Sequence, residues 1–259
     1  MRANRIFIPG YIWHLTHRCH KRDFLLKFSK DRENWIYWLF EAKKRFGIRI
    51  LNYCVTSNHI HLLVASGSNT KSIPSAMQLV AGRVAQEFNQ RKKRKGAFWE
   101  DRYHATAIES GKHLMNCMLY IDLNMVRAGV VSHPEDWKTS SFYELVSEKT
   151  RYKKIDEAAL CEFCGFKSFR DFKQFYFEEI NRRLTEKELQ EKFSWSDFLA
   201  IGSSEFIEKF KQNAGIKAMH KSTSSQNERF QLKENAFSYN GKTHGKIVLL
   251  REMNNIFWE

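Results

Sequence analysis

Two pairs of polar residues in this sequence have the types and spacing that metal-assisted chemistry needs. His59 and His61 stand two apart in an apolar run, and Tyr120 precedes Asn124 by four residues. Side chains alternate across a strand, so a strand here would place both imidazoles on one face and Ile60 on the other. On a helix, Tyr120 and Asn124 would adjoin one turn apart.

Neither pair is specific on its own. With 10 His in 259 residues, chance gives about 0.4 histidine pairs at this spacing. A tyrosine on a helix flank is usually a solvated side chain. Structural histidines and an ordinary helix flank therefore stay open as interpretations of each pair taken alone.

Together the two pairs fit a single reaction. A tyrosine hydroxyl has a pKa of about 10, so it is a poor nucleophile at neutral pH and needs an activated electrophile. A metal held by His59, His61 and the Asn124 carbonyl would polarise a phosphodiester, which Tyr120 could attack to form a phosphotyrosine link. Three neutral ligands suit Mg²⁺ or Mn²⁺, which also take oxygen ligands from phosphate and water.

Hydrophobic periodicity predicts the strands and helices that would carry these residues. The pattern predicts strands at Tyr11–Arg18, Ile48–Val55, His59–Ala65 and Arg102–Ile108, and helices at Ser29–Phe46, Ile73–Phe88 and Lys112–Arg127. The order β-α-β-β-α-β-α predicts an α+β fold, a ferredoxin-like split βαβ sandwich. We expect an antiparallel sheet with the first two helices on one face, and an extra helix that carries Tyr120.

The character of the chain changes after residue 146. We predict a catalytic domain at 1–146 and a smaller, mostly helical accessory domain at 147–259, with a DNA-binding or regulatory role. Helices are expected around Phe169–Tyr176, Trp195–Ala200 and Glu205–Lys211. Ser222–Arg229 is typical of a polar linker, and Phe237–Leu250 could hold a strand.

Composition and charge point to a polyanion partner. Lys plus Arg total 43 and Asp plus Glu 29, a net charge of +14, and the pI is about 9.6. The first 150 residues hold 24 basic and 13 acidic residues and the remainder 19 and 16, so the binding surface is expected in the first half. A cationic protein without such a partner stays open. Five scattered Cys and no apolar run of membrane-spanning length predict a cytoplasmic protein with reduced thiols and no membrane partner. With a DNA partner, we expect it to be nucleoid-associated.

Three motifs occur in a fixed order and carry a resemblance to a known family. They are Asn58-His-Ile-His-Leu-Leu-Val64, Phe98-Trp-Glu-Asp-Arg-Tyr103 and Tyr120-Ile-Asp-Leu-Asn-Met-Val-Arg-Ala-Gly-Val130. Together they resemble the HUH-motif tyrosine transposases, specifically the REP-associated tyrosine transposases, over about residues 5–145. The family usually has Pro after the Asn where this chain has Met125. Because Pro weakens a helix, Met125 is expected to let the helix continue.

The resemblance implies a mechanism and a set of site residues. It assigns His59, His61 and Asn124 to a divalent metal and Tyr120 to nucleophilic attack on single-stranded DNA. The products would be a 5′-phosphotyrosine and a free 3′-OH that rejoins to another end, without a nucleotide cofactor. The substrate implied is a hairpin of palindromic repeat DNA with a single-stranded flank. Whether the chain acts as a monomer or a homodimer stays open.

Basic residues in the first half are the candidate DNA contacts, because Lys and Arg neutralise phosphates. They are Arg18, Arg83, Arg91, Lys92, Lys93, Arg94, Lys95, Arg102 and Arg127. A solvated charge run is the competing interpretation of Arg91–Lys95, and Trp99 is expected in the core rather than as a platform for a base.

Other function classes predict different outcomes. A non-catalytic repeat-DNA-binding protein on the same fold would bind without forming an adduct. A metallohydrolase would use the His pair to activate water and leave hydrolysed ends. An RNA-binding sandwich would carry aromatics on its central strands, where this chain has His59 and His61.

Overall fold

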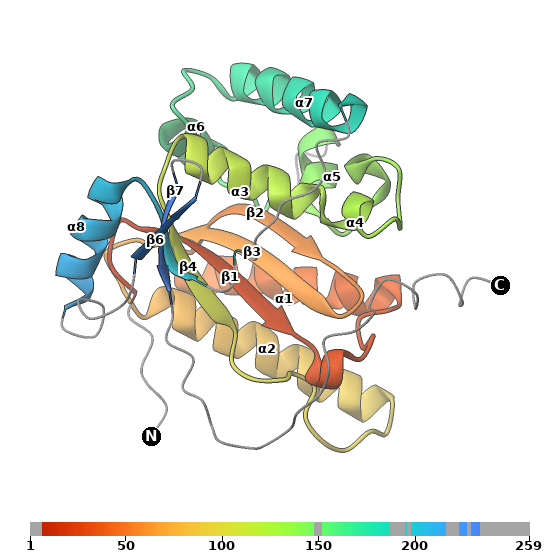
Figure 1. The fold of residues 1–259 in the computed structure, drawn as a ribbon. Helices are drawn as coiled ribbons and strands as arrows, with labels where there is room; N and C mark the ends of the chain where they lie inside the picture. The colour runs from red at the N-terminus through yellow and green to blue at the C-terminus, as the bar shows by residue number, and fades with distance from the viewer. Residues whose placement is uncertain are drawn as a thin grey trace, which may run out of the picture.

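The computed structural model describes residues 7–147, 152–186, 195, 198–215, 223–226 and 229–233. Its first part has the predicted order β-α-β-β-α-β-α (Figure 1). The strands are β1 Ile12–Arg18, β2 Arg49–Val55, β3 His59–Ala65 and β4 His104–Ile108. The helices are α1 Ser29–Phe46, α2 Ser72–Arg91, α3 Lys112–Asp122 and the single turn α4 Asn124–Arg127, with short 3₁₀ turns η1 His20–Arg22 and η2 Pro134–Asp136.

These strands form the predicted sheet. The order begins β2-β3-β1-β4, and β1 lies antiparallel to both β3 and β4. In this register Thr16 is opposite His61 and Arg18 is opposite His59. Opposed residues share a face, so the polar side chains of β1 and β3 gather on one side. The α+β, ferredoxin-like fold class is confirmed.

One face of the sheet is covered by α1 and α2, as expected (Figure 1). Trp35, Leu39 and Ala42 are fully buried at helical spacing along α1, which is the stripe that makes this segment helical. Gly47 ends α1 at φ +63°, a left-handed conformation that suits glycine, and its N–H donates to Lys43 O at 2.9 Å.

The opposite face is covered by α3 and, above it, by segments from later in the chain (Figure 1). These segments are α5 Ser141–Val146, α6 Glu157–Cys164 and α7 Phe169–Thr185. Along α3 and α4, Leu114, Met118, Ile121 and Met125 are buried at helical spacing, whereas Ala128, which would continue this stripe, is exposed. Asp122 and Asn116 are buried as well, because the later helices enclose the flank that would otherwise face solvent.

The expected continuous helix over 112–127 is wrong, because it breaks at Leu123 despite Met125. The physical reason lies at the Tyr120 carbonyl. In an unbroken helix that oxygen would accept the N–H of Asn124, but here it accepts Arg127 Nη2 at 2.6 Å. A side chain inserted into the backbone ladder is a recognised cause of such breaks.

The later part of the chain extends the same sheet. After β4 the order continues β5-β7-β6, with β5 Phe198–Gly202 parallel to β4, and β7 Arg229–Lys233 antiparallel to both β5 and β6 Thr223–Gln226. Helix α8, Ser204–Ala214, packs against β5. The helix expected at Trp195–Ala200 and the linker expected at Ser222–Arg229 are therefore wrong. Pairing with the distant edge of β4 overrides local propensity. The strand expected at 237–250 lies outside the described residues, and the domain boundary at 146 stays a prediction.

Candidate active site

His59 and His61 lie on the α3 side of β3, as strand alternation predicts. Their ring centroids are 4.8 Å apart. Nδ1 of His59 is 2.7 Å from Asn58 Oδ1 and 2.9 Å from Thr56 Oγ1. Because Asn58 Oδ1 can only accept, Nδ1 carries the proton toward it and Nε2 keeps a lone pair. Nε2 of His59 is therefore the ring nitrogen that could bind a metal ion.

Asn124, the third candidate metal ligand, lies next to His61. Its Nδ2 is 3.3 Å from Nε2 of His61. The oxygen and nitrogen of an amide exchange places by a rotation of the side chain, so the same position can present Oδ1 to an ion. Within the described part of the chain, no group of three His, Cys, Asp or Glu is placed to hold a metal. An ion at this position would need the Asn124 amide beside His59 and His61.

Burial keeps these imidazoles neutral, the form that binds metals. Burial and then the charge of Arg18 lower the pKa of His59 to about 4. The pKa of His61 is lowered well below its ordinary value, first by burial and then by His59 and His14. A proton on either ring would carry a charge into a site with little water. The donor set therefore fits a divalent cation at neutral pH.

Tyr120 lies beside this cluster, one turn before Asn124 on the other side of the break. Its ring meets the His61 ring edge-on, with centroids 5.7 Å apart and an interplanar angle of 89°. The Arg127 guanidinium lies 4.3 Å from the centroid of the Tyr120 ring. The ring centroids of Trp195 and Tyr120 are 5.9 Å apart. The structure thus brings the predicted nucleophile and the three predicted ligands together.

Asp122 anchors the end of α3, between Tyr120 on α3 and Asn124 on α4. Its buried carboxylate accepts hydrogen bonds from Tyr176 Oη at 2.5 Å, Asn52 Nδ2 at 3.0 Å and Ser141 Oγ at 3.3 Å. Burial raises the pKa of Asp122 to about 7, although these hydrogen bonds act in the opposite direction. The anchor ties α3 to β2, α5 and α7 at once.

One buried histidine beside the site was missed by sequence reasoning. Nε2 of His14 is 3.0 Å from Nδ1 of His61, and burial, followed by the charge of His59, lowers the pKa of His14 to about 3. His17, three residues on, points elsewhere, with Nε2 2.7 Å from Asp101 O and its ring stacked on Trp99. The contact with His61 needs the register of β1 on β3, which no local pattern reveals.

The predicted DNA contacts divide between two places. Arg18 and Arg127 lie at the cluster, since Arg18 opposes His59 and Arg127 covers Tyr120. The loop after α2 reaches the same end of the sheet, because Cys19 bridges to Trp99 and His20 N donates to Phe98 O at 2.8 Å. Lys92, Lys93, Lys95 and Arg102 are exposed.

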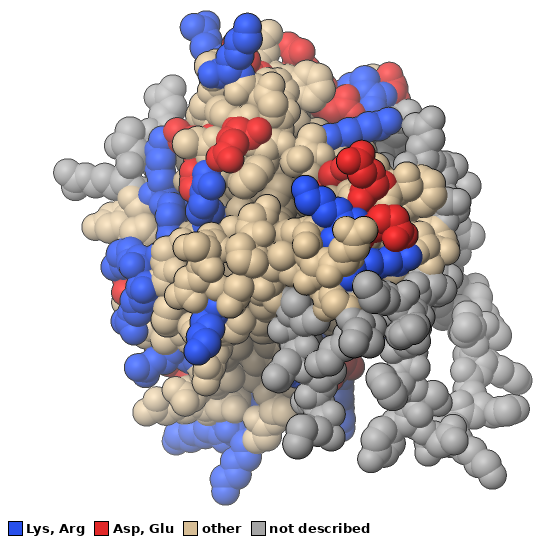
Figure 2. Space-filling view, turned by 90° about the vertical axis from the view of Figure 1, so that its left-hand side faces the viewer, with Lys and Arg blue, Asp and Glu red and all other residues tan. Residues whose placement is uncertain are grey.

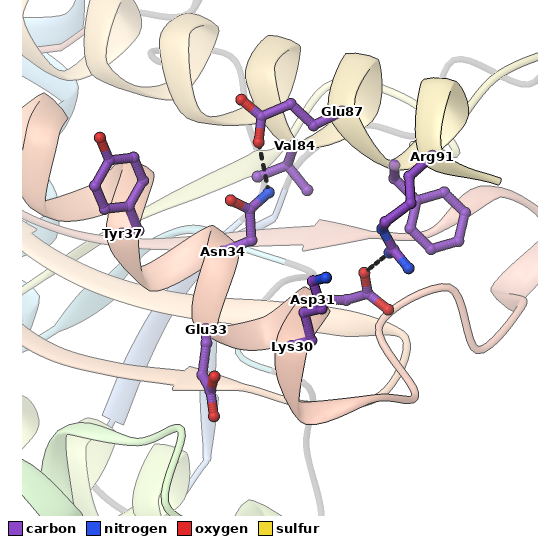
Figure 3. A pocket seen from close by; sticks show the side chains of 9 residues that line it. Lys30, Asp31, Glu33, Asn34, Tyr37, Val84, Glu87 and Arg91 are labelled. Carbon is purple, nitrogen blue, oxygen red and sulfur yellow. Dashed lines mark hydrogen bonds and ion pairs between the residues drawn. The ribbon is translucent and has the colours of Figure 1, made fainter.

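Three other arginines have partners in the fold. Arg83 lies over the Trp38 ring at 5.2 Å, and Arg94 donates to Ala97 O at 2.9 Å. Arg91 pairs with the buried carboxylate of Asp31 at one end of a groove of about 380 Å³ between α1 and α2 (Figure 3). Arg83 and Arg91 thus belong to the α1–α2 side, away from Tyr120. Trp99, expected in the core, is instead half-buried and packs against the edge of the core, with its Nε1 donating to Ala81 O at 2.9 Å.

The face that carries α8 has an uneven distribution of charge. In Figure 2 uncharged side chains fill much of the middle of this face, among the described residues, while Lys and Arg gather along one edge and at the lower end. None of the described helices combines the length and apolar character that crossing a membrane requires.

Comparisons with known proteins find similarity to transposases. The model of the family described as IS200-like transposases matches residues 8–124, just under half of the chain. A curated Haemophilus influenzae protein described as a REP-associated tyrosine transposase is 27% identical over an alignment of 99 residues, which covers 35% of this chain and 56% of that protein. The match therefore spans little more than half of the relative's length.

Two solved structures are also similar to part of the chain. A REP-associated tyrosine transposase bound to a REP hairpin has a TM-score of 0.48 and 21% identity, over 57% of this chain and 86% of its own. A transposase crystal structure from Deinococcus radiodurans has a TM-score of 0.33 and 16% identity, over 45% of this chain and 92% of its own.

Proposed function

Because residues 8–124 match the IS200-like transposase family, as the sequence motifs predicted, we propose that the chain is a metal-dependent DNA strand transferase with Tyr120 as its nucleophile. The observation that supports this best is one cluster. His59, His61 and Asn124 offer neutral donors, and Tyr120 lies edge-on to His61 on the same side of the sheet. Its substrate would be single-stranded or hairpin DNA from palindromic repeats, the class implied by the resemblance.

The residues divide the reaction among them. Mg²⁺ or Mn²⁺, held by the two histidines and Asn124, would supply positive charge at the scissile phosphodiester. Tyr120 Oη attacks phosphorus, the Tyr120–phosphorus bond forms and the bond to the 3′ oxygen breaks. The tyrosine gives up one proton and the departing 3′ oxygen takes one up. The 5′-phosphotyrosine keeps the energy of the phosphodiester, so rejoining needs no ATP.

The surroundings of Tyr120 support its role. Arg127 holds the Tyr120 backbone carbonyl and covers its ring, so the side chain approaches the cluster from a fixed direction, as a reactive geometry requires. Arg18 and the exposed lysines of the loop after α2 reach the same end of the sheet. They offer phosphate contacts on the approach to the site.

The test is covalent capture of DNA. The full chain is incubated with end-labelled single-stranded hairpin DNA from the flanks of its own gene, with Mg²⁺ or Mn²⁺, and run on a denaturing protein gel. We expect a labelled adduct that disappears with Tyr120→Phe and with EDTA, while DNA affinity stays nearly unchanged. Tyr37→Phe, at an exposed tyrosine of α1, is the matched control and should keep the adduct.

Each other outcome contradicts a defined part of the proposal. An adduct that survives Tyr120→Phe assigns the nucleophile to another residue. An adduct undiminished in EDTA removes the metal role. Binding without an adduct, across several flanking hairpins, favours a non-catalytic repeat-DNA-binding protein, and hydrolysed ends without an adduct favour a metallohydrolase.

A further inference from the structure

Behind the candidate ligand His61 lies a buried histidine for which the proposed reaction has no role. Nε2 of His14 is 3.0 Å from Nδ1 of His61, and His14 is 1% exposed. The other nitrogen of the same ring, His61 Nε2, faces Asn124 at 3.3 Å. The two nitrogens of an imidazole point away from each other, so His14 and Asn124 lie on opposite sides of His61. His14 therefore lies behind the ligand and not beside the ion.

We propose that His14 is a positioning residue that accepts a hydrogen bond from Nδ1–H of His61 and so leaves Nε2 of His61 free to bind the metal. This inference rests on the proposed function. A histidine that binds a metal through one nitrogen carries its proton on the other, and the acceptor of that proton fixes the tautomer and the ring orientation. His59 has the same arrangement with a different acceptor, since its Nδ1 meets Asn58 Oδ1 at 2.7 Å.

The packing around His14 holds its ring in this orientation. The rings of His14 and His61 are nearly parallel, with an interplanar angle of 12°. Tyr120 and Trp195 meet the His14 ring edge-on, at centroid distances of 6.4 Å and 6.5 Å. A ring enclosed in this way keeps its Nε2 directed at His61.

The reverse hydrogen bond would disable the site. If His14 donated to Nδ1 of His61, the proton of His61 would lie on Nε2 and block the ligand position. When His14 accepts, its own proton lies on Nδ1, which is buried and has no hydrogen-bond partner among the described residues. The orientation that metal binding needs thus leaves one buried N–H unsatisfied, which costs stability. A metal–ligand bond at His61 is the interaction that offsets this cost.

The test measures metal binding without DNA. His14→Phe keeps a ring but removes the acceptor, and His14→Gln restores an acceptor oxygen. His17→Phe is the matched control, since it changes a buried histidine of the same strand whose ring stacks on Trp99 instead. We expect His14→Phe to weaken Mn²⁺ affinity, measured by electron paramagnetic resonance of the full chain, about 10-fold to 100-fold. His14→Gln should recover most of the affinity, and His17→Phe should match the wild type.

A second readout reports the tautomer directly. In protein labelled with ¹⁵N-histidine, long-range ¹H–¹⁵N spectra distinguish Nδ1–H from Nε2–H. We expect His61 to be the Nδ1–H form in the wild type with bound Zn²⁺ as a diamagnetic probe, and to gain Nε2–H character in metal-free His14→Phe. Melting in EDTA establishes whether each variant is folded. If His14→Phe is unfolded, His14→Leu replaces it in both measurements.

The outcomes separate this inference from the proposed function. A wild-type chain that binds no Mn²⁺ overturns the metal role and the inference with it. A wild-type chain that binds Mn²⁺, beside a folded acceptor-free variant with equal affinity and an unchanged His61 tautomer, overturns the role of His14 alone. Failure of His14→Gln to recover affinity also counts against it.

Discussion

On one face of the sheet Leu15 and Leu62 meet the apolar side chains of α1 and α2, whereas on the other face His14 and His61 lie against α3. Both faces are buried, but they are stabilised differently. Apolar groups contribute wherever they leave water, while each buried polar group needs a partner in a defined direction. The polar face therefore costs stability to build and is the one that can hold a reactive site.

The largest effects are expected at two neighbouring residues of β3, Leu62 and His61, which lie on opposite faces of the sheet. Leu62 is 1% exposed on the α1–α2 face, so Leu62→Ala should lower the free energy of unfolding by about 2–5 kcal/mol. Measured by urea denaturation, this loss should come with unchanged adduct formation per folded molecule. A loss of adduct at full occupancy of the folded state would mean that the two faces are coupled.

His61→Ala should have the opposite profile. Removing this proposed metal ligand should abolish metal-stimulated adduct formation on the denaturing gel. The free energy of unfolding in EDTA should change less than with Leu62→Ala. The imidazole contributes little net stability because it is buried as a neutral polar group. If His61→Ala destabilised the metal-free chain more than Leu62→Ala, the polar face would be the main source of stability.

The two faces should also differ in how their contribution to stability depends on pH, because the buried carboxyl of Asp122 lies on the polar face. Burial raises the pKa of Asp122 from 3.8 to about 7, so the folded state favours the protonated carboxyl. The contribution of Asp122 therefore lowers the free energy of unfolding as pH rises from about 4 to about 7, by up to about 4 kcal/mol. Asp122→Asn removes this dependence. The free energy of unfolding of the variant, relative to the wild type, should therefore rise across that pH range and become constant above it.

Urea denaturation in EDTA at several pH values measures the unfolding free energies of variant and wild type. The test is how their difference changes with pH, so a pH-independent effect of the new amide does not matter. Asp156→Asn is the control with the opposite sign. Hydrogen bonds from Ala159 N–H and Arg49 outweigh burial and lower the pKa of Asp156. That carboxylate therefore stabilises the folded state above its unfolded pKa. The free energy of unfolding of Asp156→Asn, relative to the wild type, should fall as pH rises through about 4. A flat difference for Asp122→Asn would show that its carboxyl stays ionised throughout.

What the sequence predicts and what it misses follow the same division. Local periodicity is enough for β3, for α1 and for the strip that joins Tyr120 to Asn124. The strand β5 escapes local reasoning because Ala200 and Ile201 are set by pairing with Ala107 and Ile108 across more than ninety residues. Its apolar residues suit a helix or a strand equally.

The polar partners of the site escape for a related reason. The contacts of His14 with His61 and of Asp122 with Tyr176 join segments that only the folded chain brings together. The break at Leu123 depends on a side-chain hydrogen bond from Arg127 that replaces a backbone one. Residue types indicate which groups can react, while the groups that orient them depend on tertiary register.

A smaller effect is expected at Tyr176, where α7 meets the end of α3. Tyr176 is fully buried, and its hydroxyl donates to Asp122 at 2.5 Å. Tyr176→Phe keeps the ring and removes one hydrogen bond to a group that can carry charge, which should cost about 1–3 kcal/mol of unfolding free energy. Because Asp122 lies between Tyr120 and Asn124, adduct formation should fall as well.

Phe172→Leu supplies the control for Tyr176→Phe, since it alters packing on the same helix next to Tyr176 but leaves the hydrogen bond to Asp122 in place. We expect it to lower stability with little change in adduct formation per folded molecule, measured on the same denaturing gel. If both variants lower adduct formation equally, α7 acts through packing alone. If only Tyr176→Phe does, one hydroxyl from the later part of the chain helps to set the position of Tyr120, the proposed nucleophile.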